Sequence, residues 1–477
     1  MAYRYGNRYQ KELFPRSIEE YIAEEDPARV YDAFVEALKL EELGIPIDEK
    51  KVGNASYDPR TMLKILLYGY SYGLRSSRQL ERALYHNISF MWISGGLKPD
   101  HKTLAEYRRK NKKALKEVLK KVARMCLKIG MIEGNILFVD GSKFRANASI
   151  KASWTKEKSK KVLEKLDKKI SDLIEESERI DEAEAGEESL VKLREELSSK
   201  ESRKKKVEEI LEELEKEGIE EKNTTDKDSR KMKSIHGTHV SYNVQQVVDE
   251  KHGLIISSEA VSEKNDSQEF AKQIKKAEEV LLKESKVACG DAGYANTEEL
   301  KKIAERGTKV VVPSQRQALH KKEKKYSKKE FKYDKEKDKY ICPAGKELRY
   351  KGENKKKEHR VYKIVKAKEC HECKNYLECT KSKTGRRIIR LKEEETRERL
   401  EQIYESKEGQ EIYSQRKEKV ELPFGHIKQN LGIRSFLLRG LEGVKAELSL
   451  ISSCFNIRRM MTILGKVDLL KKLALMS

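Results

Sequence analysis

The chain has 477 residues, which is long enough for roughly two to four domains and at least one sizeable core. Lysine and arginine number 103 against 81 aspartate and glutamate, so the net charge is +22 and the expected partner is a polyanion such as nucleic acid. The sequence contains no apolar run of about 18 residues or more and no apolar leader, so we expect a cytoplasmic protein with no membrane partner.

The first segment, residues 1–130, has apolar residues at the three- and four-residue spacing that predicts α-helices. Tight turn signals and the arginines Arg75, Arg78 and Arg82 fit a helix-turn-helix-like DNA reader. A plain helical bundle with a charged face explains the same pattern. We expect a helical DNA-binding domain and take the three arginines as candidate DNA contacts.

A short apolar run at residues 135–144 changes to the pattern of a buried strand, which Gly141 is expected to close. Asp140 stands at the expected end of this strand. A carboxylate that finishes an apolar strand is costly to bury unless something compensates its charge.

Between residues 155 and 222 the composition changes to lysine, glutamate and leucine, with apolar residues alternately three and four apart. This pattern predicts an antiparallel helical hairpin inserted in the fold. We expect it to be a solvated structural arm rather than a carrier of chemistry.

Strand and helix signals then alternate, which predicts a mixed sheet covered by helices. Asp291 follows the strand signal in KVACGDAGY. The expected strands lie at 240–249, 253–261 and 308–314 and within 286–294, where the strand ends in the run Gly290-Asp291-Ala292-Gly293, and the expected helices lie near 267–283 and 297–306.

Three acidic residues, Asp140, Asp291 and Glu421, stand out by context. In a mixed sheet the first and fourth strands can be neighbours, so two carboxylates at their ends can share a metal ion with a third from a covering helix. Oxygen ligands suit Mg²⁺ or Mn²⁺, and two such ions about 3.5–4 Å apart promote phosphodiester attack. Each carboxylate taken alone fits a turn or helix cap better, but the three together in a basic chain favour a catalytic site.

Several segments resemble the bacterial insertion-sequence DDE transposases: SYDPRTMLKILLYGYSYGLRSSRQLERA, GGLKPDHKTLAEYRRKN, VDGSKFRANAS, SYNVQQVVDEKHGLI and GDAGY. The resemblance covers nearly the whole chain. It implies an RNase H-like catalytic domain, divalent-metal chemistry with Mg²⁺ or Mn²⁺, and a nucleoid-associated homodimer that holds element terminal inverted repeats and target DNA.

The family's third catalytic residue lies in a helix motif of Tyr, Arg, Glu and Lys, matched by Tyr413, Arg416, Glu421 and Lys428. The familiar form places three residues between Arg and Glu, whereas here there are four. Glu418 is therefore the competing glutamate. By resemblance, Arg416 and Lys428 contact DNA phosphates near the cut end, although Arg416 also fits a solvated helix face.

Four cysteines, Cys342, Cys370, Cys373 and Cys379, cluster between Asp291 and the glutamate motif. An odd total of seven cysteines in a reducing compartment argues against disulfides. Their spacing favours a structural tetrahedral Zn²⁺ site over free thiols, with His371 able to replace one cysteine. The surrounding lysine-rich strings are expected either to touch DNA or to be mobile.

These patterns predict an α/β protein with an RNase H-like mixed sheet, an inserted helical hairpin, a Cys-rich insertion and an all-α N-terminal domain. Two other functions remain open: a domesticated DNA-binding protein that no longer cuts, and a nuclease without strand transfer. The expected segments are the N-terminal domain (1–130), the catalytic domain in two parts (131–154 and 223–320), the hairpin (155–222), the Lys- and Cys-rich insertion (321–392) and the glutamate helix with the C-terminal region (393–477).

Overall fold

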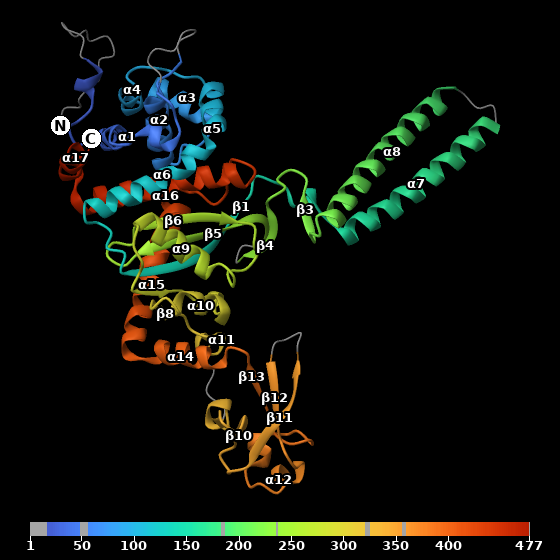
Figure 1. Cartoon of the computed structure of the whole chain (residues 1–477). Helices are drawn as coiled ribbons and strands as arrows, with labels where there is room; N and C mark the ends of the chain where they lie inside the picture. The colour runs from blue at the N-terminus through green and yellow to red at the C-terminus, as the bar shows by residue number, and fades with distance from the viewer. Residues whose placement is uncertain are drawn as a thin grey trace, which may run out of the picture.

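The computed structural model describes residues 17–47, 56–182, 187–234, 237–319, 325–354 and 359–476 (Figure 1). The N-terminal part is helical, as the sequence predicted. Two of its helices begin at a proline behind an aspartate, Asp26 or Asp58, whose side chain accepts hydrogen bonds from free backbone N–H groups. The α-helices of this part are α1 (Pro27–Glu36), α2 (Pro59–Ser71), α3 (Ser77–His86), α4 (Ile88–Ile93), α5 (His101–Lys110) and α6 (Lys112–Lys128).

The N-terminal helices pack against the helices at the C-terminal end of the chain. Almost all of α2 is buried, because it packs on α1 and on α16 (Leu441–Leu464). The last helix, α17 (Lys466–Ala474), returns to pack on α1. The N-terminal part therefore shares its core with the C-terminal helices.

The central sheet is mixed and RNase H-like, which confirms the predicted fold class. Its main path runs β6-β5-β1-β7-β8, and β4 also pairs with β5. Strands β1, β7 and β8 are parallel, whereas β5 is antiparallel to β1, β4 and β6. The strands are β1 (Ile136–Arg145), β4 (Arg230–Ser234), β5 (Gly237–Asp249), β6 (Ile255–Val261), β7 (Val287–Cys289) and β8 (Lys309–Val311).

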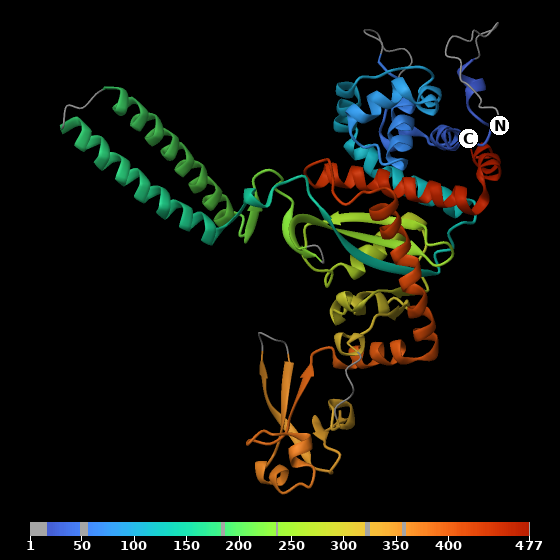
Figure 2. The ribbon, with the colours of Figure 1, turned by 180° about the vertical axis from the view of Figure 1, so that it is seen from behind.

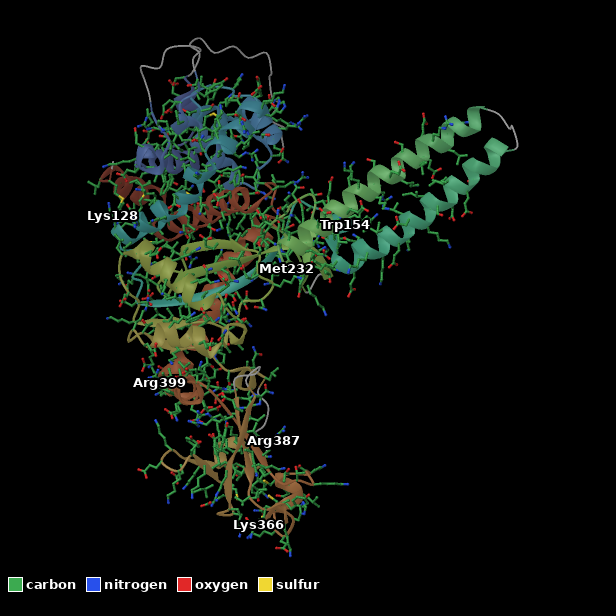
Figure 3. All side chains as sticks on the ribbon, turned by 45° about the vertical axis from the view of Figure 1, so that its right-hand side comes forward. Lys128, Trp154, Met232, Lys366, Arg387 and Arg399 are labelled. Atoms are coloured by element: carbon green, nitrogen blue, oxygen red, sulfur yellow. The ribbon has the colours of Figure 1, made fainter. Side chains whose placement is uncertain are left out.

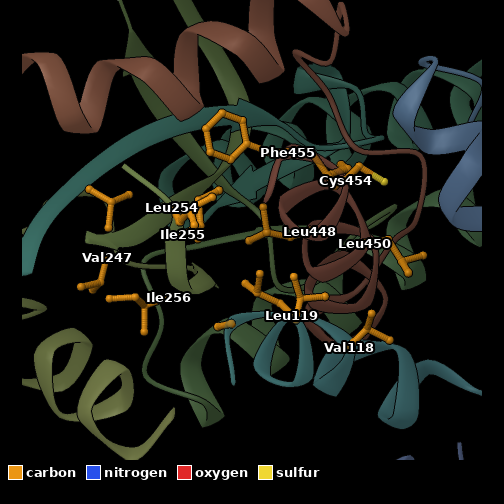
Figure 4. Close-up of a cluster of buried hydrophobic side chains, with 14 of the residues drawn as sticks. Val118, Leu119, Val247, Leu254, Ile255, Ile256, Leu448, Leu450, Cys454 and Phe455 are labelled. Atoms are coloured by element: carbon orange, nitrogen blue, oxygen red, sulfur yellow. The ribbon is translucent and has the colours of Figure 1, made fainter. Parts of the chain in front are cut away.

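Helices cover the sheet. Helix α9 (Phe270–Leu281) packs on β5, β6 and β1, α15 (Lys407–Gly425) contacts β1, β5, β7 and β8, and α6 and α16 lie against β6. Figure 4 shows Leu119 of α6 and Leu448 of α16 beside Ile255 of β6, and all three are buried. Full burial of each such side chain contributes about 1.5–3 kcal/mol. This core fixes the central sheet, and the strands of that sheet carry the candidate site.

A helical hairpin projects away from the sheet in both Figure 1 and Figure 2. Its helices are α7 (Lys156–Glu182) and α8 (Glu187–Lys216). They pack on each other and bury Leu166, Val207 and Leu214. At the base, labelled by Trp154 in Figure 3, β2 (Ser153–Thr155) pairs with β3 (Glu221–Asn223).

The Cys-rich insertion forms a second sheet, of order β13-β12-β11-β10-β9, at the end of the molecule away from the N-terminal helices (Figure 1). Figure 3 labels Lys366 and Arg387 there, and Arg399 on α14 (Glu394–Glu405). Its own core includes Phe331, Tyr340 and Leu348. The strands are β9 (Lys332–Asp334), β10 (Lys339–Ile341), β11 (Glu347–Asn354), β12 (His359–Ile364) and β13 (Arg387–Leu391), and the short helices of this part are α12 (Ala367–His371) and α13 (Tyr376–Cys379). Two further short helices, α10 (Thr297–Ala304) and α11 (Gln315–Ala318), precede it in the chain.

One prediction was wrong in detail. Strand β1 does not end at Asp140 but continues to Arg145, because β5 goes on pairing with it as far as the pair Arg145 and Ser241. Of the two alternatives for the lysine-rich strings, the described residues 325–341 favour an ordered segment over a mobile one, because its tyrosines and Phe331 pack in the second sheet. Within the described ranges, the structure contains no helix with the length and apolar character needed to span a membrane.

Candidate active site

Asp140 lies in β1 just beyond the stretch that pairs with β7. Strand β1 pairs with β7 only from Ile136 to Phe138, whereas Asp140 itself pairs with Gln246 of β5. On this side of β1, strand β7 therefore does not extend as far as Asp140. Its side chain is 19% exposed.

Asp291 follows the end of β7 and occupies the same edge. Its Oδ1 accepts a hydrogen bond from the backbone N–H of Gly293 at 2.8 Å, which caps a short turn of helix. Its side chain is 43% exposed. The parallel pairing of β1 with β7 thus places the first two predicted carboxylates at neighbouring strand positions.

The guanidinium of Arg416, on α15, spans these two aspartates. Its Nη2 lies 2.7 Å from Oδ1 of Asp140 and 3.6 Å from Oδ2 of Asp291. Burial raises the pKa of Asp140 to about 6 despite the opposing charge of Arg416, and the nearby Asp291 carboxylate adds to the rise. The site therefore holds two carboxylates whose mutual repulsion is compensated by a cation.

Glu421 also lies on α15 but has an exposed side chain. It is five residues after Arg416, which places it about 140° further round a regular helix. The position four residues after Arg416 is Val420, which is buried. The extra residue in the motif thus directs Arg416, rather than Glu421, toward the aspartates.

The competing glutamate, Glu418, has a side chain that is 82% exposed and lies 3.7 Å from Lys419 Nζ. No three His, Cys, Asp or Glu side chains within the described part of the chain gather closely enough to hold a metal ion. The structure consequently brings Asp140 and Asp291 together with Arg416, but it does not bring either glutamate into coordination distance.

Lys428, just after α15, reaches β1 on the other side of Asp140. Its Nζ donates to Ser142 Oγ at 2.5 Å and to the carbonyl oxygen of Lys143 at 3.3 Å. It also lies 4.6 Å from the centroid of the Phe144 ring. Burial lowers the pKa of Lys428, and the lysine is fixed beside the site rather than on a solvated face.

Tyr413 is half-buried next to Arg416. Its ring packs edge-on against Tyr404 with centroids 5.1 Å apart. Burial raises the pKa of Tyr413, and the charge of Arg416 opposes that rise. The tyrosine and arginine of the predicted motif therefore adjoin each other at the aspartates.

The three arginines proposed from the N-terminal pattern have different surroundings. Arg78 and Arg82 lie on exposed positions of α3 one turn apart. Arg75 is instead interior: its Nη1 lies 2.6 Å from Oε1 of Glu447, a side chain with no exposed surface. Its Nη1 also donates to the carbonyl oxygen of Ser435 at 2.8 Å. This location is at odds with a DNA contact, so we leave Arg75 out of the proposed DNA surface.

The four cysteines line one small cavity of about 30 Å³ in the second sheet domain. The backbone N–H of Lys346 donates to Cys342 Sγ at 3.3 Å, and that of Arg386 donates to Cys370 Sγ at 3.4 Å. Burial raises the pKa of the Cys379 thiol, and the other three cysteines add to the rise. His371 is exposed and packs against the Tyr376 ring.

Sequence reasoning missed a carboxylate beside the site, Asp266, in the turn between β6 and α9. Its Oδ1 accepts hydrogen bonds from Asn243 Nδ2 and Gln245 Nε2, both at 2.6 Å. The signal available was a polar run, EKNDSQ, directly after an apolar strand. That run was indistinguishable from an ordinary turn.

Two family models match the chain. Residues 16–110 match a transposase domain (DUF772), and residues 341–461 match a transposase DDE domain. The second match includes the cysteine cluster, Arg416, Glu421 and Lys428. Neither the curated proteins nor the solved structures that were compared gave a match. Together with the RNase H-like sheet, the two matches support a transposase of the bacterial insertion-sequence DDE type.

Proposed function

We propose that this chain cleaves the ends of its insertion element and joins the freed 3′-hydroxyl to target DNA. The observation that carries the proposal is the single guanidinium of Arg416 spanning Asp140 and Asp291 at the open end of two parallel strands. A position that attracts one cation between two partly buried carboxylates is suited to a divalent ion.

Asp140 and Asp291 would hold Mg²⁺ or Mn²⁺, since both offer carboxylate oxygens and Asp140 is destabilised when charged and uncompensated. Two such ions would supply an activated nucleophile and neutralise the leaving oxygen of the scissile phosphodiester. Glu421 is proposed as the third carboxylate. Its approach requires α15 to turn about its axis when DNA or metal binds.

The motif residues have separable proposed roles around that centre. Arg416 neutralises the aspartates in the metal-free protein and would pass to a DNA phosphate when the metal binds. Lys428, held by Ser142, would meet a phosphate on the far side of Asp140. Tyr413 would position Arg416 and line the DNA path.

DNA contact is proposed to extend over the exposed Arg78 and Arg82 of α3. Arginine forks bind phosphate oxygens in pairs, and these two have no ion-pair partner within the described residues. We further propose a homodimer in the DNA complex, because two terminal repeats need two equivalent sites. Such a protein would be cytoplasmic and nucleoid-associated.

The cysteine cavity is proposed as a structural zinc site that stabilises the second sheet. Four thiols that line one cavity, two of which, Cys342 and Cys370, accept backbone N–H bonds, have the chemistry of a Cys₄ site. The side chains would have to close around the ion to reach coordination distance. Free thiols in an apolar cavity are the alternative.

A strand-transfer experiment tests the proposed activity. The full chain is incubated with Mg²⁺, a labelled DNA fragment bearing the element's terminal repeats, and a supercoiled target. We expect cleaved ends and covalently joined products. Cleavage without joining would identify a nuclease, and binding without cleavage would identify a domesticated DNA-binding protein.

A further inference from the structure

The carboxylate of Asp266 is held by side chains of the central sheet. Besides the amide hydrogen bonds to its Oδ1 from Asn243 and Gln245, Lys143 Nζ lies 3.7 Å from the same oxygen. Asp266 is therefore held in place through one of its two oxygens.

The amide that holds Asp266 is itself oriented. Tyr294, three residues after Asp291, donates its hydroxyl to Gln245 Oε1 at 2.5 Å. This bond fixes which end of the amide faces Asp266, so that Nε2 can donate to it. Asn243, Gln245 and Tyr294 have no exposed surface. A wholly buried polar network is rigid and costly to misalign, which is more than a surface turn needs.

The second oxygen of Asp266 faces the proposed metal carboxylates. A Cβ placed at Gly293 would lie 2.8 Å from Asp291 Oδ1 and 3.7 Å from Asp266 Oδ2, so both oxygens lie within 4 Å of one point. On the other side, a Cβ at Gly141 would lie 2.7 Å from Asp266 Oδ1. Asp266 thus lies close to Gly141, the residue after Asp140, and to Gly293, two residues after Asp291.

This oxygen is free to take a ligand. Within the described residues, Oδ2 of Asp266 accepts no hydrogen bond, and the side chain is 24% exposed.

We propose that Asp266 is a further carboxylate of the catalytic centre. Because no three such side chains of the described residues gather closely enough to hold an ion in the metal-free protein, Asp140, Asp291 and the Oδ2 of Asp266 would close around a divalent cation as it replaces Arg416. The inference rests on the proposed metal site and adds a ligand from the turn before α9. Asn243, Gln245 and Tyr294 are then positioning residues that aim this carboxylate. A purely structural Asp266 would tie its turn to β5 without affecting metal affinity.

Mn²⁺ binding to the full-length protein without DNA, measured by electron paramagnetic resonance, separates these roles. Asp266→Asn keeps the size of the side chain and removes its charge. Glu263→Gln is the matched control, because it removes one charge from an exposed position in the same turn. We expect Asp266→Asn to weaken Mn²⁺ binding about tenfold or more, with Glu263→Gln close to wild type. Equal losses in the two variants, or none, would overturn the proposal.

A measurement on the wild-type protein guards against a variant that fails to fold. Fe²⁺ bound in place of Mg²⁺, with ascorbate and peroxide, generates radicals that cut the backbone beside the ion. We expect cuts near Asp140, Asp291 and Asp266, located by mass spectrometry. Cuts near the first two without one near Asp266 would overturn this proposal alone. A wild-type protein with no Mn²⁺ binding and no cuts would instead refute the proposed metal site.

Discussion

The guanidinium of Arg416 lies 2.7 Å from the Asp140 carboxylate. Because the same group also lies 3.6 Å from Asp291, Arg416 occupies the position in which a shared cation would neutralise both. A divalent ion and Arg416 should therefore compete for the two aspartates.

This competition predicts that Arg416→Gln binds Mn²⁺ more tightly than wild type, by roughly tenfold, or about 1.4 kcal/mol. In chelator the variant should melt at a lower temperature, since two carboxylates then face each other uncompensated. Calorimetric titration and thermal denaturation measure the two effects. Lys417→Gln removes an exposed charge at the next position and is the control. Equal Mn²⁺ affinities in both variants would contradict the competition.

Metal binding should also depend on pH. Burial raises the pKa of Asp140 to about 6, so its carboxyl group is largely protonated at pH 5, where an unperturbed aspartate is charged. A metal ligand must lose its proton, so the Mn²⁺ affinity should be full above about pH 7 and fall as the pH drops through about 6. Arg416→Gln should move that midpoint upward, because the arginine charge opposes the rise. A midpoint near 4 in titrations of wild type would be inconsistent with a buried Asp140.

The arginines of the N-terminal part should separate into DNA-binding and structural residues. The double variant Arg78→Ala, Arg82→Ala should bind DNA more weakly and reduce the log–log salt slope by about two, since each lost phosphate contact contributes about 0.9. Its thermal stability should be unchanged. Fluorescence anisotropy at several salt concentrations measures this. Wild-type affinity and slope would remove α3 from the proposed DNA surface.

Arg75→Ala is the structural counterpart, because it leaves the buried Glu447 without its partner. We expect a loss of about 3–5 kcal/mol in the free energy of unfolding. Point variants are preferable to the isolated fragment 1–130, since α2 and α6 pack on α16 and would be exposed in that fragment. Unchanged stability in Arg75→Ala would show that the pair with Glu447 is dispensable.

Zinc should co-purify at about one ion per chain if the four cysteines bind it. Cys370→Ser with Cys373→Ser should lose the ion and lower the melting temperature of the insertion. Cys126→Ser is a matched control, because Cys126 is buried in the main core far from this cavity in the chain and in the fold. Elemental analysis of protein purified without chelator decides the matter, and protein with no zinc would leave the free-thiol alternative.

The elements with clear periodicity were predictable from the sequence. The hairpin of α7 and α8, the strand pair β5 and β6, and the neighbouring positions of Asp140 and Asp291 all follow from local patterns. The second sheet was missed because lysines and glutamates interrupt its short strands, and its core comes from tyrosines spread over residues 326–362. The burial of Arg75 was not predictable, since its partner Glu447 is distant in sequence.

The register of α15 marks the limit of motif reasoning. The motif identified Arg416 and Lys428, and both lie beside β1. The sequence could not show that one extra residue turns Glu421 away from the aspartates. Asp266 was overlooked because its role depends on Asn243 and Gln245, which only the sheet pairing brings to it.

The most direct test of the account is Mg²⁺-dependent cleavage of DNA that bears the terminal repeats, measured beside DNA binding. Asp140→Asn, Asp291→Asn and Glu421→Gln should each abolish cleavage, by about a hundredfold or more, while binding stays near wild type, because each removes metal charge rather than a packing contact. Glu418→Gln should cleave normally. Full cleavage by Asp140→Asn or Asp291→Asn would contradict the metal site itself, and full cleavage by Glu421→Gln with loss in Glu418→Gln would assign the third carboxylate to Glu418.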